Sequence, residues 1–451
     1  MNRIFVAIIL IAFVTAVYNQ ATFVPPLDPA VEVIEPITRM TNGLFDMAKS
    51  AVMDIVLPLI GAMTFFLGLM KVGEKAGAMM VIAKVVRPIM VRLFPDVPPN
   101  HPAMSAMILN MAANALGLGN AATPFGLKAM QELDKLNPEK GTATNAMALF
   151  LAINTSAIHL FPTGVIAVRD TLGSTDPAGI LPTTLFATTC AAISAIVSCK
   201  IIERFVPAPT GLVPTPTVPD PATATAATTP AVPISVGIPT ESTEADAYPL
   251  WVSVAAIGGL MAVIPVTVVY GEVVGKWIVP FLVVGFIGWG WVRGVSVYEA
   301  FVEGARDGFD TAVRIIPYLV AILASIGMLR GAGAIDLFTG LVGPFTEPFG
   351  MPAEALPMAL LRPLSGSGAY GVMLATMKEH GPDSYIGYLV STLQGSTETT
   401  FYVLAVYFGS IQVTRIRHAM IPGIIADVFG ALGSIVAVQV YFTYNGLWPT
   451  P

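Results

Sequence analysis

Long apolar runs recur along this chain and restrict it to a helical fold embedded in a membrane. Hydrophobic residues make up 55% of its 451 residues and charged residues only 12%, against about 25% charged in soluble domains. So few charges could not cover a soluble protein of this length, whereas lipid needs no such cover. We therefore predict an all-α, polytopic integral membrane protein. The runs long enough to cross about 30 Å of hydrocarbon are 51–70, 181–202, 250–270, 277–292, 311–329 and 419–442.

Shorter apolar segments, interrupted by Gly, Pro and Asn, lie between these runs. Segments this short do not cross a bilayer alone, and non-helical backbone at membrane depth is tolerated only inside protein or beside a cavity. We therefore expect half-helices or re-entrant hairpins. Their expected ranges are 78–94, 103–116, 121–136, 144–158, 353–364, 370–378 and 385–393.

A segment rich in Pro, Thr and Ala divides the chain into two membrane domains. Residues 206–248 contain almost no large apolar side chain, so they cannot bury a core and are expected to form a flexible linker. The domains on either side are 40–205 and 249–448. The apolar run near the start resembles a signal peptide, but the residues after it form a poor cleavage site. We expect a retained transmembrane helix at 1–20.

The two domains share an order of features that indicates an internal repeat. Residues 68–73 parallel residues 327–333, and each segment closes a long apolar helix that contains a proline. A first glycine break follows, at 114–124 in one domain and 362–371 in the other. A second polar break spans 153–161 and 393–401. Within it Asn154 aligns with Gln394, and Ser156 aligns with Ser396.

Basic residues indicate that the two units are inverted. Lysine and arginine gather on the cytoplasmic side of membrane proteins. In the first unit they follow the run 51–70, between Lys71 and Arg92, so its C-terminal end is expected inside. In the second unit Arg293 and Arg306 precede the run 311–329 and Arg314 lies in its first turn, so its N-terminal end is expected inside. Inverted repeats with broken helices are the architecture of many secondary transporters.

Glu398 is the strongest single candidate for a functional residue. A carboxylate inside an apolar stretch is expensive and usually faces a cavity or a partner. We predict that it binds substrate or a coupling cation, or carries a proton; the alternative is a buried salt bridge with Arg362. Its neighbours Gln394, Ser396 and Thr397 supply further donors and acceptors, and Arg362 itself is a candidate substrate ligand.

Amide and hydroxyl side chains surround the other breaks. Asparagine can bind a polar ligand, but it can also cap a broken helix end. His159 lies in the second break, where a packed, hydrogen-bonded histidine is the simpler alternative. Ser365 and Ser367 could cradle an anion with their backbone amides, or the glycines between them could only allow close helix packing. The first unit contributes the candidate ligands Asn110, Asn114, Asn120, Thr123, Asn154 and Ser156.

Other polar residues have simpler explanations. Asp427 lies inside the last apolar run, and an ion pair with Arg415 or Arg417 would account for it. Cys190 and Cys199 lie half a turn out of phase on one helix, so we expect no disulfide between them. No zinc-type spacing is present, and a net charge of −6 offers no basic footprint for nucleic acid.

The two sets of breaks resemble a known family. Residues 103–170, with Leu-Gly-Leu-Gly-Asn-Ala-Ala-Thr-Pro-Phe-Gly and later Ala-Ile-Asn-Thr-Ser, are similar to spore maturation protein A. Residues 356–430, with Arg-Pro-Leu-Ser-Gly-Ser-Gly and later Gln-Gly-Ser-Thr-Glu-Thr-Thr-Phe-Tyr, are similar to spore maturation protein B. The chain resembles a fusion of the two. The resemblance implies nucleoside recognition (Gate) membrane domains, which are similar to the core of concentrative nucleoside transporters, and it fits a homodimer.

These features together predict ion-coupled secondary transport of a small polar, nucleoside-like solute across the inner membrane. No ATPase motif is present, so a Na⁺ or H⁺ gradient would supply the energy, with Glu398 as the coupling residue and no other cofactor. The main alternative is a non-transporting assembly or ligand-sensing component, in which the linker or the charged face 128–135 would be the sensitive part. An enzyme is not expected, because Ser365, Ser367 and Ser396 lack a base at a recognisable spacing.

Overall fold

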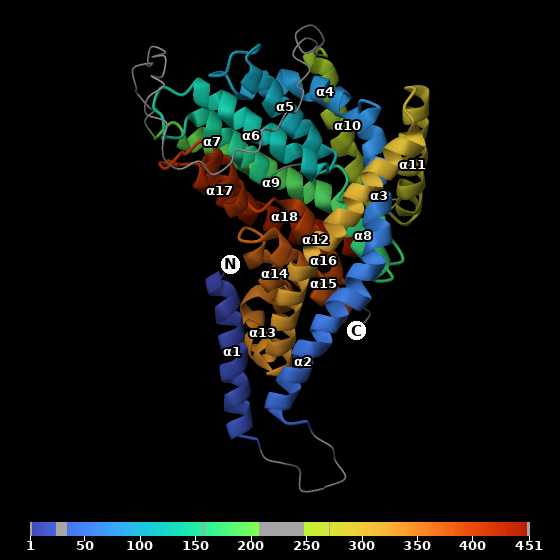
Figure 1. Cartoon of the computed structure of the whole chain (residues 1–451), viewed down its shortest axis with the longest axis vertical. Helices are drawn as coiled ribbons and strands as arrows, with labels where there is room; N and C mark the ends of the chain where they lie inside the picture. Colours follow the sequence, from blue (N-terminus) through green and yellow to red (C-terminus); the bar gives the residue numbers. More distant parts are fainter. Residues whose placement is uncertain (1, 24–33, 157, 207–247, 270, 449–451) are drawn as a thin grey trace, which may run out of the picture.

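The computed structural model describes the chain except residues 1, 24–33, 157, 207–247, 270 and 449–451 (Figure 1). The described part is helical, with no β-strand in it, as predicted. Its first-half helices are α1 (Asn2–Ala21), α2 (Pro36–Ser50), α3 (Leu57–Lys75), α4 (Ala78–Leu93), α5 (Pro102–Ala115), α6 (Gly119–Lys135), α7 (Asn145–Thr155), α8 (Thr163–Thr171) and α9 (Leu181–Ile202). The second-half helices are α10 (Leu250–Val269), α11 (Gly271–Val292), α12 (Val297–Gly331), α13 (Ala334–Thr346), α14 (Leu356–Leu361), α15 (Gly366–His380), α16 (Tyr385–Ser396), α17 (Thr400–Ser410) and α18 (Met420–Asn445).

Four helical stretches are long and apolar enough to cross a membrane. They are Pro36–Lys75, Pro177–Ile202, Val297–Gly331 and Met420–Asn445. Shorter apolar helices accompany them, among them Leu250–Ala262 and Trp277–Val292. The protein is therefore a multi-pass membrane protein. The linker predicted at 206–248 lies almost entirely outside the described residues.

Two of the predicted spans are parts of longer helices. The run 51–70 belongs to a continuous rod in which α2 passes through a π-helical turn, Ala51–Val56, into α3. Pro58 follows this turn. A proline has no N–H to donate to the carbonyl oxygen one turn earlier, and its ring clashes with that carbonyl. A π-helical turn before the proline can accommodate the missing hydrogen bond and the clash. The run 311–329 belongs to α12, which continues through charged residues to its start at Val297.

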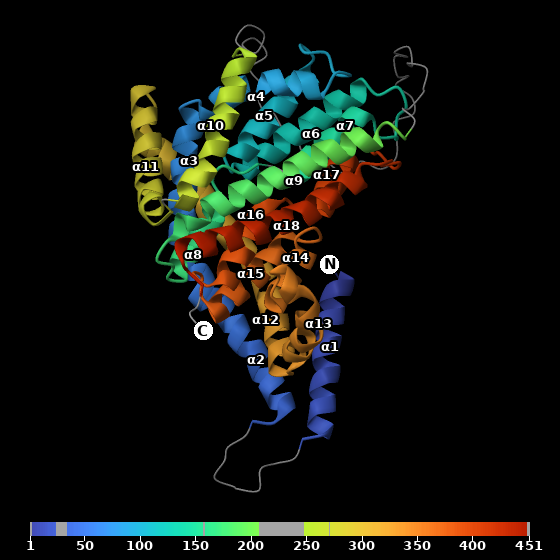
Figure 2. The same ribbon diagram turned by 180° about the vertical axis from the view of Figure 1, so that it is seen from behind.

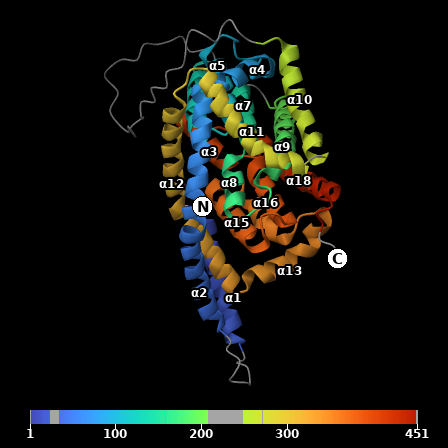
Figure 3. The ribbon, with the colours of Figure 1, turned by 90° about the vertical axis from the view of Figure 1, so that its right-hand side faces the viewer.

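The α2–α3 rod and α12 lie side by side and run antiparallel (Figure 3). Near one end, a Cβ added to Gly43 would lie 2.4 Å from the carbonyl oxygen of Gly327. Near the other end, a Cβ added to Gly68 would lie 2.9 Å from the carbonyl oxygen of Phe301. Gly68 and Gly327, which align in the repeat, thus contact the opposite helix at opposite ends. This is the arrangement that an inverted repeat predicts.

The last helices of the two halves, α9 and α18, form a second antiparallel pair (Figure 2). A Cβ added to Gly433 would lie 3.2 Å from Ala187 Cα, and one added to Gly430 would lie 3.4 Å from Ala191 Cβ. Small residues at the crossing let the two backbones approach closely, as is common between membrane helices. The pair lies between the first-half helices α4–α7 and the second-half helices α13–α15.

Matching turns recur at aligned positions in the two halves. Thr144 and Ser384 each cap a helix by accepting a hydrogen bond from the N–H three residues on. Gly141 and Gly381, which precede these caps, both have positive φ, 79° and 85°. Local geometry therefore repeats together with the sequence pattern.

The broken helices connect two separate hydrophobic cores. One core contains the buried residues of α5, α6 and α7, and the other contains those of α14, α15 and α16. After its break, however, the first half's chain continues as α8, which packs in the second core through Val165 and Ile166. The second half's chain continues as α17, which packs in the first core through Val403 and Leu404. Each half thus sends the helix that follows its break into the core built around the other half's broken helices, and the breaks lie at the boundary.

Candidate functional site

The two interrupted segments meet at this boundary. α7 ends at Thr155 and the chain resumes as α8 at Thr163, whereas α16 ends at Ser396 and the chain resumes as α17 at Thr400. The Glu398 N–H donates to the Thr155 carbonyl oxygen at 2.7 Å. A backbone group freed by one break is therefore satisfied by the other, as buried backbone groups require.

Each interrupted segment is also tied to the glycine break of its own half. The Leu160 N–H donates to the Ala115 carbonyl oxygen at 2.9 Å, and the Phe401 N–H donates to the Pro363 carbonyl oxygen at 3.1 Å. The two donors lie one position apart in the aligned repeat, because Phe401 aligns with Phe161. All four breaks are thereby joined into one cluster.

The Glu398 carboxylate lies between residues of both halves. Its Oε1 is 3.1 Å from Nε2 of His159, and its Oε2 is 3.8 Å from the guanidinium of Arg362. The salt bridge to Arg362 that we considered is therefore present, but His159 is the nearer partner. The Glu398 side chain is 40% accessible and that of Arg362 only 7%. The carboxylate thus has a free face that a ligand could approach.

Arg362 holds the second-half break in shape. Its guanidinium donates to Thr399 Oγ1 at 3.2 Å and also bonds the Thr397 carbonyl oxygen. Gly366 lies against the same threonine, because a Cβ there would be 2.7 Å from Thr399 Oγ1. A larger residue in place of this glycine would displace the threonine.

The asparagines of the first half form a second polar group beside this one. Asn114 Nδ2 donates to Asn154 Oδ1 at 3.1 Å, and Asn154 Nδ2 donates to the Phe150 carbonyl oxygen at 2.9 Å. Asn110 Nδ2 donates to the Ala122 carbonyl oxygen at 2.7 Å and to the Tyr407 hydroxyl at 3.3 Å. Three predicted residues are therefore brought together, and part of their hydrogen bonding capacity stabilises the breaks themselves.

The remaining predicted residues have more local roles. Ser156 and Ser396 donate back to the carbonyl oxygens of Ala152 and Leu393 in their own helices. Ser365 caps α15 by accepting from the Gly368 N–H at 3.0 Å. Thr123, Ser367 and Gln394 are partly buried and Thr397 is buried, while the Asn120 side chain lies outside the described residues.

Several polar contacts were not predicted. Asp427 accepts a hydrogen bond from the Thr400 hydroxyl at 2.6 Å, so the suggested pairing with Arg415 or Arg417 is wrong. Those arginines contact the loop between α6 and α7 instead: Arg415 pairs with Glu139, and Arg417 donates to the Ala143 carbonyl oxygen. Thr399 belongs to the polar run beside Glu398 that the sequence indicates, but its bond to Arg362 was not predicted. The bond between Tyr407 and Asn110 gave no sequence signal, because Tyr407 lies in an apolar helix.

Several buried polar atoms at the breaks have no hydrogen-bond partner among the described residues. Buried polar atoms are nearly always bonded to protein or to water, so these atoms require water or a polar ligand as a partner. They are Asn110 Oδ1, His159 Nδ1, Arg362 Nε, Gln394 Oε1 and Asp427 Oδ1.

Comparison with known proteins identifies the family. A Gate (nucleoside recognition) family model matches residues 56–171 and 312–413, one segment in each half. Spore maturation protein B of Bacillus subtilis is 42% identical over 164 residues, which are 36% of this chain and 92% of that protein. Spore maturation protein A of the same organism is 42% identical over 184 residues, 39% of this chain and 91% of that protein. The chain belongs to the spore maturation protein A and B family.

The family membership bears out the resemblance seen in the sequence, and the two Gate segments support the internal repeat. Among solved structures, CNTnw in an outward-facing state is similar over 99% of this chain and 100% of its own, with 13% sequence identity and a TM-score of 0.43. A TM-score this low indicates a distant likeness only.

Proposed function

We propose that this family member is an ion-coupled secondary transporter of a small polar, nucleoside-like solute in the inner membrane. The Gate family description, nucleoside recognition, supports the class of solute. The binding site would lie at the junction of the four breaks, with the thirteen predicted residues from Asn110 to Glu398 as its surroundings and Glu398 at its centre.

The observation that carries the proposal is the position of Glu398. Its carboxylate is near His159 of the first half and Arg362 of the second, and its backbone N–H is bound to Thr155. A ligand that bonds this carboxylate therefore affects both halves at once. A ligand that binds one arrangement of the two halves more tightly than another shifts the protein toward the first arrangement, and binding is then coupled to a conformational change.

The same carboxylate is the candidate for ion coupling. Na⁺ prefers oxygen ligands, and the break offers the Glu398 carboxylate beside the hydroxyls of Thr397 and Thr399. A proton could instead be exchanged between Glu398 and His159, whose nitrogen and oxygen lie at hydrogen-bond distance, 3.1 Å. The two routes differ in whether Na⁺ is required.

A thermal-unfolding screen of the purified protein tests the proposal. Nucleosides, nucleobases, small organic acids and amino acids would each be added with and without Na⁺. A ligand at about 100 times its dissociation constant stabilises the folded state by about 2.7 kcal/mol. We expect a nucleoside-like ligand to stabilise the wild type but not Glu398→Gln. Glu299→Gln, an exposed glutamate on α12, is the matched control and should behave like the wild type. Ligand stabilisation that survives Glu398→Gln would show that the assigned site is wrong.

The relatives favour one other function. Their names describe spore maturation and not transport, which fits a membrane assembly or ligand-sensing component. That alternative predicts no solute flux in reconstituted vesicles and tolerance of Glu398→Gln. It places the sensitive residues on the charged face 128–135, where Glu132 pairs with Lys128 and Lys135, each at 2.8 Å.

A further inference from the structure

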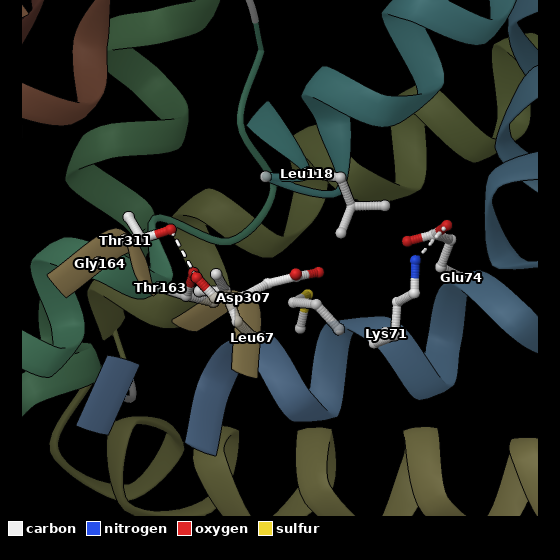
Figure 4. A pocket seen from close by; sticks show the side chains of 10 residues that line it. Leu67, Lys71, Glu74, Leu118, Thr163, Gly164, Asp307 and Thr311 are labelled. Atoms are coloured by element: carbon white, nitrogen blue, oxygen red, sulfur yellow. Dashed lines mark hydrogen bonds and ion pairs between the residues drawn. The ribbon is translucent and has the colours of Figure 1, made fainter. Parts of the chain in front are cut away.

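A pocket of about 410 Å³ lies beside the breaks of the first half, between α3 and α12 (Figure 4). Pockets of a few hundred cubic ångströms hold small ligands. Its walls include Leu67 and Met70 of α3 and Thr311 of α12. Gly117 and Leu118, from the glycine break, and Thr163 and Gly164, from the start of α8, complete it.

Acidic side chains outnumber basic ones around this pocket. Lys71 pairs with Glu74 at 3.0 Å and approaches Glu303 at 3.7 Å, and Lys75 also pairs with Glu303. Both lysines are therefore neutralised by glutamates. Asp307 lies one turn further along α12, on the same face as Glu303. Its carboxylate forms no ion pair among the described residues.

Figure 4 shows Asp307 on one side of the pocket and the Lys71–Glu74 pair on the other. Of the charged residues that line the pocket, Glu74 and Asp307 carry carboxylates and Lys71 carries an ammonium group, which leaves an excess negative charge. A cleft lined by one sign of charge with low-dielectric walls concentrates ligands of the opposite sign. The pocket therefore favours a positively charged group.

The pocket shares a wall with the Glu398 site. Residues 159–164 form one short segment whose first member, His159, contacts Glu398 and whose last member, Gly164, lines the pocket. The Tyr370 hydroxyl, from α15 of the second half, donates to the Gly164 carbonyl oxygen at 3.3 Å. A change in the conformation of this segment would therefore alter both the Glu398 contact and the wall of the pocket.

The aligned position in the second half is covered. Arg330 aligns with Lys71, and the helix end beside it is packed by α1, where Asn19 Nδ2 donates to the Ala332 carbonyl oxygen at 2.8 Å. Ala12 and Ala16 of α1 are buried against the same region of α12. The inverted repeat is therefore asymmetric here, with the pocket at one end of the helix pair and α1 at the other.

We propose that the pocket is a vestibule that attracts and holds a cationic group at Asp307 and Glu74 before that group reaches Glu398. This inference rests on the proposed transport function. The cationic group is either a protonated amine of the solute or the coupling cation. The basic residues at this end of α3 place the vestibule on the cytoplasmic side.

Calorimetric titration of the full-length protein at low salt tests the vestibule with three probes of equal chain length. These are 1,4-diaminobutane, 1,4-butanediol and succinate, whose ends are positive, neutral and negative. We expect only the diamine to bind. Asp307→Asn and Glu74→Gln should each weaken it about two- to fivefold, the range of a partly exposed charge pair. Lys71→Gln should strengthen it. Asp310→Asn, an exposed aspartate on the same helix outside the pocket, is the matched control and should leave it unchanged.

Further arms separate the cation sources and the two proposals. If NaCl displaces the diamine but KCl at equal ionic strength does not, the natural occupant of the pocket is the coupling cation. If neither salt displaces the diamine, the occupant is a protonated amine of the solute. Equal binding of the three probes, or equal effects of Asp307→Asn and Asp310→Asn, would overturn the vestibule. Solute stabilisation that still depends on Glu398 would then leave the proposed function intact. Diamine binding through Asp307 without any solute effect at Glu398 would instead leave a cation-binding pocket and remove both the transport proposal and the vestibule's role in it.

Discussion

Arg169 is a buried arginine that joins the two halves of the molecule. Its guanidinium donates to the Pro382 carbonyl oxygen at 2.5 Å and to Asp383 Oδ1 at 2.9 Å. It also lies 4.2 Å from the centre of the Tyr388 ring. A buried charge is tolerated only when it is paired and hydrogen-bonded, and here every partner named comes from the second half. The residue therefore holds the end of α8 against the start of α16.

Asp383 makes this junction sensitive to acid. Burial raises the pKa of its carboxyl, but hydrogen bonds from Ser174 and Thr175 and the charge of Arg169 together lower the pKa below its ordinary value of 3.8. A carboxyl with a lowered folded-state pKa contributes stability above its unfolded pKa and loses it as the pH falls through the folded value. The contribution should thus be present at pH 5 to 8 and disappear below about pH 4.

Asp383→Asn should lower the free energy of unfolding at neutral pH by roughly 2–3 kcal/mol, because it removes the carboxylate that is paired and hydrogen-bonded with Arg169. Unfolding temperatures of wild type and variant, measured from pH 7 down to pH 3, check this. The two curves should converge at low pH. A constant difference at all pH values would contradict the charge-based explanation.

At the scale of elements, glycines determine how the long helices cross. At Gly327 an added Cβ would lie 2.1 Å from the Gly43 carbonyl oxygen, closer than any real contact. At Gly340, on α13, an added Cβ would meet nothing within 4 Å. The same substitution should therefore have opposite effects at the two positions.

Gly327→Ala should destabilise the protein by about 1–3 kcal/mol, the usual range for overpacking. Gly340→Ala should be neutral or stabilise it by up to about 1 kcal/mol, because alanine favours a helix more than glycine does. Thermal unfolding of both variants in one detergent provides the comparison. Equal losses of stability would mean that helix propensity, and not the crossing, governs the response.

At the scale of the whole molecule, two antiparallel helix pairs and two exchanged helices make the halves interdependent. α8 belongs to the second core and α17 to the first, so neither half has a complete core of its own. A movement of one half relative to the other must bend or shift the breaks. Because Glu398 lies in one of these breaks, such a movement would change the distances between its carboxylate and its partners.

Cysteine labelling from the two faces of the membrane tests the inverted arrangement. In a chain with Cys190 and Cys199 replaced by alanine, Lys75→Cys and Glu299→Cys should react with an impermeant maleimide from the cytoplasmic face. Ile37→Cys and Asp336→Cys should react from the opposite face, because the α2–α3 rod and α12 are antiparallel. Labelling of Lys75→Cys and Ile37→Cys from the same face would contradict a rod that spans the membrane.

Much of this architecture follows from local patterns in the sequence. Apolar length and low charge determined the helical membrane class, and glycine, proline and asparagine marked the breaks. The aligned caps Thr144 and Ser384 repeat because a helix start needs the same side-chain acceptor wherever it occurs. The salt bridge between Glu398 and Arg362 was considered because an intramembrane carboxylate requires a partner.

The tertiary structure alone decided which breaks meet and which partners are nearest. His159 lies closer to Glu398 than Arg362 does, and Asp427 bonds Thr400 instead of an arginine. The exchange of α8 and α17 between cores also had no sequence signal. Hydrophobic burial is non-directional, so an apolar helix can pack in either core, and only the three-dimensional arrangement of all the helices selects one. The sequence by itself determined what must be buried and where helices must break; the packing of distant segments determined what lies beside Glu398.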